Sequence, residues 1–124
     1  MPIDPTSASA AEIARAVSAG EVSAAEVIEA TLIAIRMRDP VLNCFTAVTA
    51  QRAAARARAI DKARRNHEPL GSLAGVPFGV KNLFDVEGLA TLAGSRINQT
   101  RPPAARDAAL IERLEAAGAI LVGR

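Results

Sequence analysis

Two short apolar runs, far apart in the chain, constrain its fold more than any other feature. Residues 76–80 read VPFGV and residues 119–122 read AILV, and a helical pattern lies between them. Continuous apolar runs of this length are typical of strands buried on both faces, so the order strand, helix, strand predicts an α/β fold with parallel pairing. A buried parallel strand needs neighbours on both sides, and only two residues follow the second run. We therefore expect residues 1–124 to be the N-terminal portion of a larger single domain.

Two helices are predicted at the start of the chain. The capping-box pattern S-x-x-E, in which serine and glutamate bond each other's backbone N–H groups, occurs at residues 9–12 and 23–26. The first helix is expected to stop near Gly20, which can adopt the left-handed conformation of a helix cap. The second is expected to end before Pro40, because the residue that precedes a proline disfavours helical geometry.

A third helix is predicted from about residue 50 to 66, with two different faces. We expect its small-residue face, formed by Ala53, Ala57 and Ile60, to pack in the core. The opposite face is basic, but no aromatic residues are interleaved with it, so we interpret it as a solvated helix face rather than a nucleic-acid site. Its members are Arg52, Arg56, Arg58, Lys62, Arg64 and Arg65.

The chain thus divides into a mainly helical part, residues 1–68, and a strand-loop-helix-strand part, residues 69–124. Residues 83–86 are expected to continue the first strand after a kink, and residues 88–106 form a long loop. Asp107 is the predicted N-cap of a fourth helix, which glycine at 118 ends. The expected inner face of that helix consists of Leu110, Ile111 and Leu114.

Length and composition narrow the classes of function. The chain has a formal net charge of +2, one histidine and one cysteine, too few ligands for a zinc site or for an internal disulfide. The N-terminal MPIDPTSASA has neither the basic start nor the apolar core of a secretion signal, and no apolar run reaches the length of a membrane span. We expect a cytoplasmic protein that uses no metal or organic cofactor and contacts no membrane.

Lys81 is the candidate catalytic residue, because it ends the apolar stretch GVPFGVKN at residues 75–82. A lysine after a strand ordinarily carries its charge to solvent on a flexible stem. The alternative is a buried lysine whose ammonium form is disfavoured, which can then act as a base. Gly75 and Gly79 would allow neighbouring backbones to approach closely. The spacing does not match a phosphate-binding loop, which needs Gly-Lys-Ser/Thr.

Three stretches together resemble the amidase signature family. They read GVPFGVKNLFDVEG at residues 75–88, TLAGS at 91–95 and AGAILVG at 117–123. Within the family the resemblance is greatest to the carboxybiuret-hydrolysing members, and the A subunits of glutamyl-tRNA(Gln) amidotransferase are more distant relatives. The resemblance covers nearly the whole chain.

The resemblance implies the N-terminal part of a mixed central sheet wrapped by helices. It also implies a Ser-Ser-Lys triad, in which neutral Lys81 takes a proton through a bridging serine from the nucleophilic serine. The substrate would be a small linear amide, carboxybiuret-like or otherwise urea-like or carboxylated. The family further suggests a homodimer and a small accessory subunit.

This sequence departs from the family pattern in two respects. Asn82 follows the lysine where many members carry aspartate, and this departure is similar to the carboxybiuret subgroup. No serine of the chain lies in the Gly-Gly-Ser-Ser-Gly-Gly context that holds the two triad serines, so we expect residues 1–124 alone to be inactive. The alternatives are an amidotransferase A subunit, and an inactive fragment or scaffold. Cys44 is predicted to be a small core residue and His67 a cation at a helix end or a solvent-facing turn residue.

Overall fold

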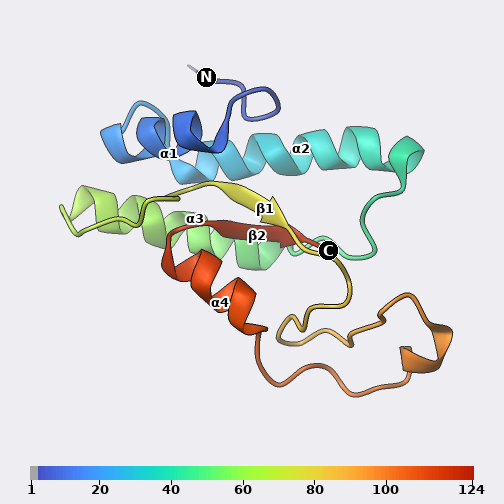
Figure 1. Cartoon of the computed structure of the whole chain (residues 1–124). Helices are drawn as coiled ribbons and strands as arrows, with labels where there is room; N and C mark the ends of the chain where they lie inside the picture. Colours follow the sequence, from blue (N-terminus) through green and yellow to red (C-terminus); the bar gives the residue numbers. More distant parts are fainter. Residues whose placement is uncertain (1–2) are drawn as a thin grey trace.

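The computed structural model describes residues 3–124. These residues form four helices, a short 3₁₀ turn and two strands. Their order is α1 (Ala10–Ala19), α2 (Ala24–Leu42), α3 (Ala50–Arg65), β1 (Pro77–Gly79), η1 (Arg96–Asn98), α4 (Ala109–Ala116) and β2 (Ile120–Gly123). β1 and β2 lie side by side, and the segment between β1 and α4 leaves the body of the molecule as an extended loop (Figure 1).

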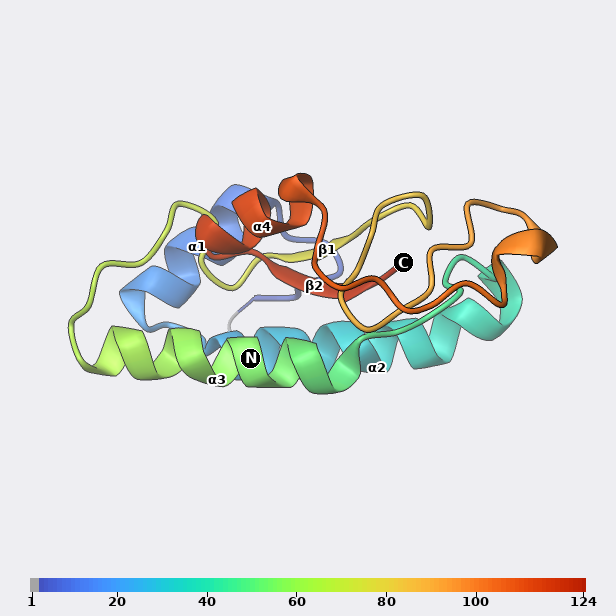
Figure 2. The same cartoon turned by 90° about the horizontal axis from the view of Figure 1, so that it is seen from below.

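The two strands pair in parallel, as the apolar runs predict. Phe78 is in register with Leu121, and a bulge follows it, so that Gly79 pairs with Gly123. All four residues of β2 are buried. α2 and α3 form a layer on one side of the strands, and α4 lies on the other side (Figure 2). The chain is therefore α/β, with the sheet in a middle layer.

Side chains of β2 alternate between two hydrophobic clusters. Ile120 and Val122 belong to the larger cluster, which α1, α2 and α3 complete. Leu121 points the other way and joins Ile111 of α4 and Val86 in a second cluster. This period of two is the side-chain geometry of a strand, and it explains why a parallel strand needs apolar residues at every position.

Both capping boxes form as predicted. Ser9 and Ser23 each accept a hydrogen bond from the backbone N–H three residues on, and the glutamate there reaches back to the serine N–H. α1 ends at Gly20, which has a φ of 74°. The small-residue face of α3 is also confirmed, because Ala53 and Ala57 are fully buried and Ile60 is 8% exposed.

The predicted end of α2 is wrong. The helix runs through Pro40 to Leu42 and is capped by Asn43 with a φ of 50°. Proline lies in the last turn, where it removes a single backbone bond. The Asp39 carboxylate ties that turn down by accepting the N–H groups of Cys44 (2.6 Å) and Phe45 (3.2 Å).

Three further predictions fail, one after β1 and two at α4. Residues 83–86 do not extend β1, because the chain turns instead and the Phe84 N–H donates to the Lys81 carbonyl at 3.1 Å. Asp107 is not the N-cap of α4; that position is Ala108, without a side-chain cap bond. On the expected inner face, Ile111 is fully buried but Leu110 is 42% exposed.

Asp61 caps α2 from a distance, which the sequence pattern did not indicate. Its side chain, only 6% exposed, accepts the N–H groups of Ala24 (2.7 Å) and Ala25 (3.0 Å). These are unpaired donors of the first helical turn, and the helix dipole favours a carboxylate there. α3 and α2 are therefore joined by a side-chain-to-backbone contact as well as by apolar packing.

Replacing Asp61 by alanine is expected to lower the free energy of unfolding by about 1–3 kcal/mol, because two donors lose their acceptor and one of them is buried. Urea unfolding measures the difference. Glu29→Ala, at an exposed position of α2, is the control and should change stability by less than about 0.5 kcal/mol. An equal loss for the two variants would contradict the capping role.

Asp107 instead belongs to an ion-pair cluster that divides the basic face of α3. Arg52 donates two parallel hydrogen bonds to its carboxylate, at 2.8 and 2.6 Å, and also lies 3.0 Å from Glu115. Arg56 donates to the Glu115 carbonyl at 2.6 Å. The prediction of one solvated basic face is therefore wrong for these two arginines, which join α3 to α4 and to Asp107, just before the N-cap of α4.

The Asp107 contacts predict an acid-sensitive contribution to stability. Hydrogen bonds from Arg52 hold the pKa of the Asp107 carboxyl below its ordinary value of 3.8. A group whose pKa is lower in the folded state binds fewer protons there than in the unfolded state. Its stabilising effect is thus complete well above pH 4 and is lost as the pH falls through the folded-state pKa. Asp107→Asn should flatten this acid limb of a stability-against-pH curve; an unchanged limb would contradict the assignment.

Candidate active site

Lys81 lies at the carboxyl edge of the two-stranded sheet. It follows Val80, whose N–H donates to the carbonyl of Gly123 at 3.1 Å, and Arg124 follows Gly123 on the neighbouring strand. In parallel sheets the carboxyl ends of the strands meet at one edge, and α/β proteins bind their ligands there. The fold thus places the candidate lysine at the edge where an active site is expected.

The Lys81 side chain is exposed in the structure. Residues 3–124 therefore show the solvent-facing arrangement, and not the buried one that a neutral lysine base requires. No hydrogen bond or ion pair of its ammonium group joins it to another of these residues.

Of the glycines at either end of the strands, Gly75 and Gly123 allow close approach by neighbouring groups, whereas Gly79 does not. At Gly75, which has a φ of 79°, a Cβ would lie 2.8 Å from the Val17 side chain. At Gly123 it would lie 2.7 Å from the Ala47 carbonyl oxygen, whereas at Gly79 the nearest atom is 3.6 Å away. At Gly75 the close neighbour is therefore a side chain and not a backbone, and at Gly79 no close approach occurs. A neighbouring backbone approaches closely at Gly123, which no sequence signal singled out.

The loop after Lys81 folds back beside the edge. The N–H of Ala93 donates to the Asn82 carbonyl at 2.8 Å, and the Thr91 hydroxyl donates to the Asp85 carboxylate. Ser95 ends this turn, its N–H bonded to the Leu92 carbonyl at 2.9 Å. The Ala-Gly-Ser segment therefore borders the site, in agreement with a role in its wall.

Arg124 is a second basic residue at this edge, and the sequence pattern gave no indication of it. It is 8% exposed, and its Nη2 donates to the Ala90 carbonyl at 2.7 Å. Burial lowers the pKa of its guanidinium, because the charged form loses hydration. The side chain thereby links the end of β2 to the loop that follows Lys81.

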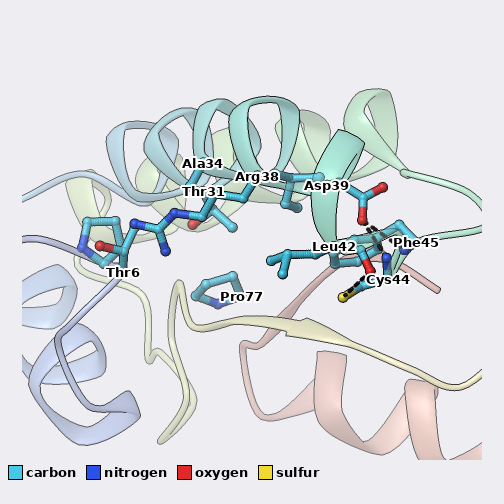
Figure 3. A pocket seen from close by; sticks show the side chains of 11 residues that line it. Thr6, Thr31, Ala34, Arg38, Asp39, Leu42, Cys44, Phe45 and Pro77 are labelled. Carbon is cyan, nitrogen blue, oxygen red and sulfur yellow. Dashed lines mark hydrogen bonds between the residues drawn. The ribbon is translucent and has the colours of Figure 1, made fainter.

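A separate hollow of about 230 Å³ lies between α2 and β1, and Lys81 does not line it. Figure 3 shows Leu42, Cys44 and Pro77 around it, with Asp39 bonded to the backbone beyond α2. Cys44 is exposed, so its predicted core position is wrong; its thiol lies 3.7 Å from the Leu42 carbonyl. His67 is exposed in a turn with a φ of 55°, which confirms the solvent-facing alternative.

Two kinds of feature are missing from residues 3–124. They contain no group of three His, Cys, Asp or Glu side chains placed to hold a metal ion. Within the same residues, no helix combines the length and the apolar character needed to cross a membrane.

Comparison with known proteins places this arrangement in a family. Residues 26–124 match the Amidase family. The AtzE subunit of the 1-carboxybiuret hydrolase of Pseudomonas sp. (strain ADP) is 52% identical over 112 residues, covering 90% of this chain and 24% of that protein. The A subunit of the glutamyl-tRNA(Gln) amidotransferase of Salinispora arenicola (strain CNS-205) is 46% identical over 122 residues, covering 98% and 24%.

A solved structure supports the same placement. It is described as a vestigial protein complex that reveals the evolutionary origins of an s-triazine catabolic enzyme, and it matches with a TM-score of 0.92 and 50% identity. The match covers 94% of this chain and 25% of that one. This chain therefore belongs to the amidase signature family. It spans about a quarter of the length of these relatives.

Proposed function

We propose that this chain is the N-terminal portion of an amidohydrolase that cleaves a small linear amide, carboxybiuret-like or otherwise urea-like or carboxylated. The observation that carries the proposal is the position of Lys81 at the carboxyl edge of the sheet, within a segment that matches the Amidase family. The identity of 52% with one subunit of a 1-carboxybiuret hydrolase favours this substrate class.

The proposed reaction uses Lys81 as the general base. Its neutral amine accepts a proton, through a bridging serine, from a serine hydroxyl that attacks the amide carbonyl. The carbon–nitrogen bond then breaks and the amine or ammonia leaves with a proton. Water hydrolyses the acyl-enzyme and restores the hydroxyl. Chain beyond these residues would supply both serines and the covering that keeps Lys81 uncharged.

The serines within residues 1–124 support the proposal that both triad serines lie in chain beyond these residues. Ser9 and Ser23 are occupied as helix caps, and Ser72 lies in the turn before β1. Residues 1–124 alone are therefore expected to release no ammonia from biuret-type or simple amides, whereas the complete enzyme should. Turnover by the 124-residue chain that Lys81→Ala abolishes would contradict the division of the triad.

A second candidate is the A subunit of a glutamyl-tRNA(Gln) amidotransferase, which the identity of 46% over nearly the whole chain favours. Hydrolysis assays on the purified complete protein distinguish the two candidate functions. Hydrolysis of carboxybiuret without a further subunit for tRNA binding supports the main proposal. Glutamine hydrolysis that depends on tRNA and a tRNA-binding partner supports the second.

Assembly as a cytoplasmic homodimer with a small accessory subunit is part of the main proposal. Large apolar side chains at the far end of α2 support a covered surface, because Met37 is 75% and Val41 is 87% exposed. Light scattering of the purified complete protein measures the assembly. A monomeric, fully active enzyme would contradict this part alone.

A further inference from the structure

The side chain of Asn82 is bonded at both ends, next to the candidate catalytic lysine. Its Oδ1 accepts the Leu92 N–H at 3.1 Å, and its Nδ2 donates to the Thr46 hydroxyl oxygen at 2.8 Å. Leu92 belongs to the loop that returns to the sheet edge, and Thr46 to the segment before α3. Asn82, the residue after Lys81, is therefore bonded to a loop 10 residues further on and to a segment 36 residues earlier in the chain.

The directions of these bonds follow from the groups themselves. A backbone N–H can only donate, so the atom facing Leu92 is the oxygen of the Asn82 amide and the other is its NH₂ group. The Thr46 hydroxyl donates its own proton to the Arg124 carbonyl at 3.1 Å. A donor chain thus runs from Asn82 through Thr46 to the end of β2.

Only an amide satisfies both ends of this arrangement. An ionised aspartate at position 82 could accept from Leu92 but has no proton for the Thr46 oxygen, whose hydroxyl is already directed at Arg124. Its lone pairs would face those of Thr46, and one of the bonds would break. A carboxylate would also place a negative charge beside Lys81, which favours the charged form of an amine.

We propose that Asn82 is a positioning residue that holds Lys81 at the sheet edge through Leu92, Thr46 and the carbonyl of Arg124. This inference rests on the proposed role of Lys81. Asn82 itself need not touch the substrate. Because a small misplacement of a reacting group lowers the rate steeply, loosening this residue should affect kcat more than KM.

The test uses Asn82→Asp, Thr46→Val and their combination in the complete enzyme, with carboxybiuret as substrate. Each single variant is expected to lower kcat about 10-fold or more, with KM within about 3-fold. Because the two residues act through one bond, the double variant should be no slower than the slower single variant. Thr46→Ser keeps the hydroxyl and should retain kcat within about 2-fold.

Several results would overturn the inference: unchanged kcat in both single variants, a change confined to KM, multiplicative losses in the double variant, or an equal loss in Thr46→Ser. If Asn82→Asp fails to fold, Thr46→Val decides, because it is isosteric and lies at an exposed position. Lys81→Ala, measured in parallel, separates the two claims. Activity that survives Lys81→Ala refutes the proposed function, whereas activity lost there but kept in both positioning variants refutes only this inference.

Discussion

Replacing Lys81 by alanine in the complete enzyme is expected to lower kcat by about 10³-fold or more without loss of the fold. A positioned general base contributes about 10²–10⁴-fold to the rate, and here the same amine would also return the proton to the leaving group. The exposed side chain makes no hydrogen bond within residues 3–124, so its removal should leave stability nearly unchanged. Steady-state kinetics and the thermal unfolding midpoint measure the two effects.

The chain offers a matched control for this experiment. Lys62 is its only other lysine and is exposed on α3, so Lys62→Ala should retain full activity. Lys81→Arg keeps the charge but cannot lose its proton at neutral pH, and it should be as inactive as the alanine variant. More than a tenth of the activity remaining in Lys81→Ala would refute the assignment of the base.

The second large effect is on stability: Arg52→Met should lower the free energy of unfolding by about 2–4 kcal/mol. The side chains of Asp107 and Glu115 are only 13% and 14% exposed, and Arg52 is the cation that neutralises both. Removing the cation of this partly buried cluster leaves two carboxylates charged and poorly hydrated. The pKa of Arg52 is raised by its hydrogen bonds to Asp107, so the guanidinium stays charged at every pH of interest.

Urea unfolding measures this loss, with Arg58→Met as the control. Arg58 lies on the same helix but is exposed, and its replacement should cost less than about 0.5 kcal/mol. Combining Arg52→Met with Asp107→Asn should destabilise less than the sum of the single variants, because the two residues share one interaction. Similar losses for Arg52→Met and Arg58→Met would show that the cluster contributes nothing measurable.

These two residues differ in how far the sequence revealed them. Lys81 could be identified because its motif is contiguous and resembles a family. Arg52 is one of six basic residues on a helix, and no local pattern separates it from Arg58. Its partners lie 55 and 63 residues further along the chain, so the cluster is revealed only by the tertiary structure, in which the Arg52 side chain reaches both carboxylates.

Errors in the predicted elements have a related cause. Asp39 precedes a proline and therefore disfavours helical geometry. Its carboxylate nevertheless stabilises the last turn of α2, because it accepts hydrogen bonds from the backbone just after the helix. The apolar residues 83–86 suggested a strand, but the chain turns and buries Val86 against Ile111 and Leu121. Each preference is worth about 1 kcal/mol or less, so local side-chain bonds exceed it in the first case and tertiary packing exceeds it in the second.

By itself, the sequence determined the features that act over a few residues: both capping boxes, the glycine that ends α1, and two apolar runs that suit a parallel pair. It also carried the motif around Lys81. Only the tertiary structure decided which polar groups meet: Asp61 at the start of α2, Arg52 with its two carboxylates, and Asn82 with Thr46 and Leu92. The reason is that caps and turns are bonds between near neighbours in the chain, whereas these contacts exist only after packing has brought distant segments within hydrogen-bonding distance.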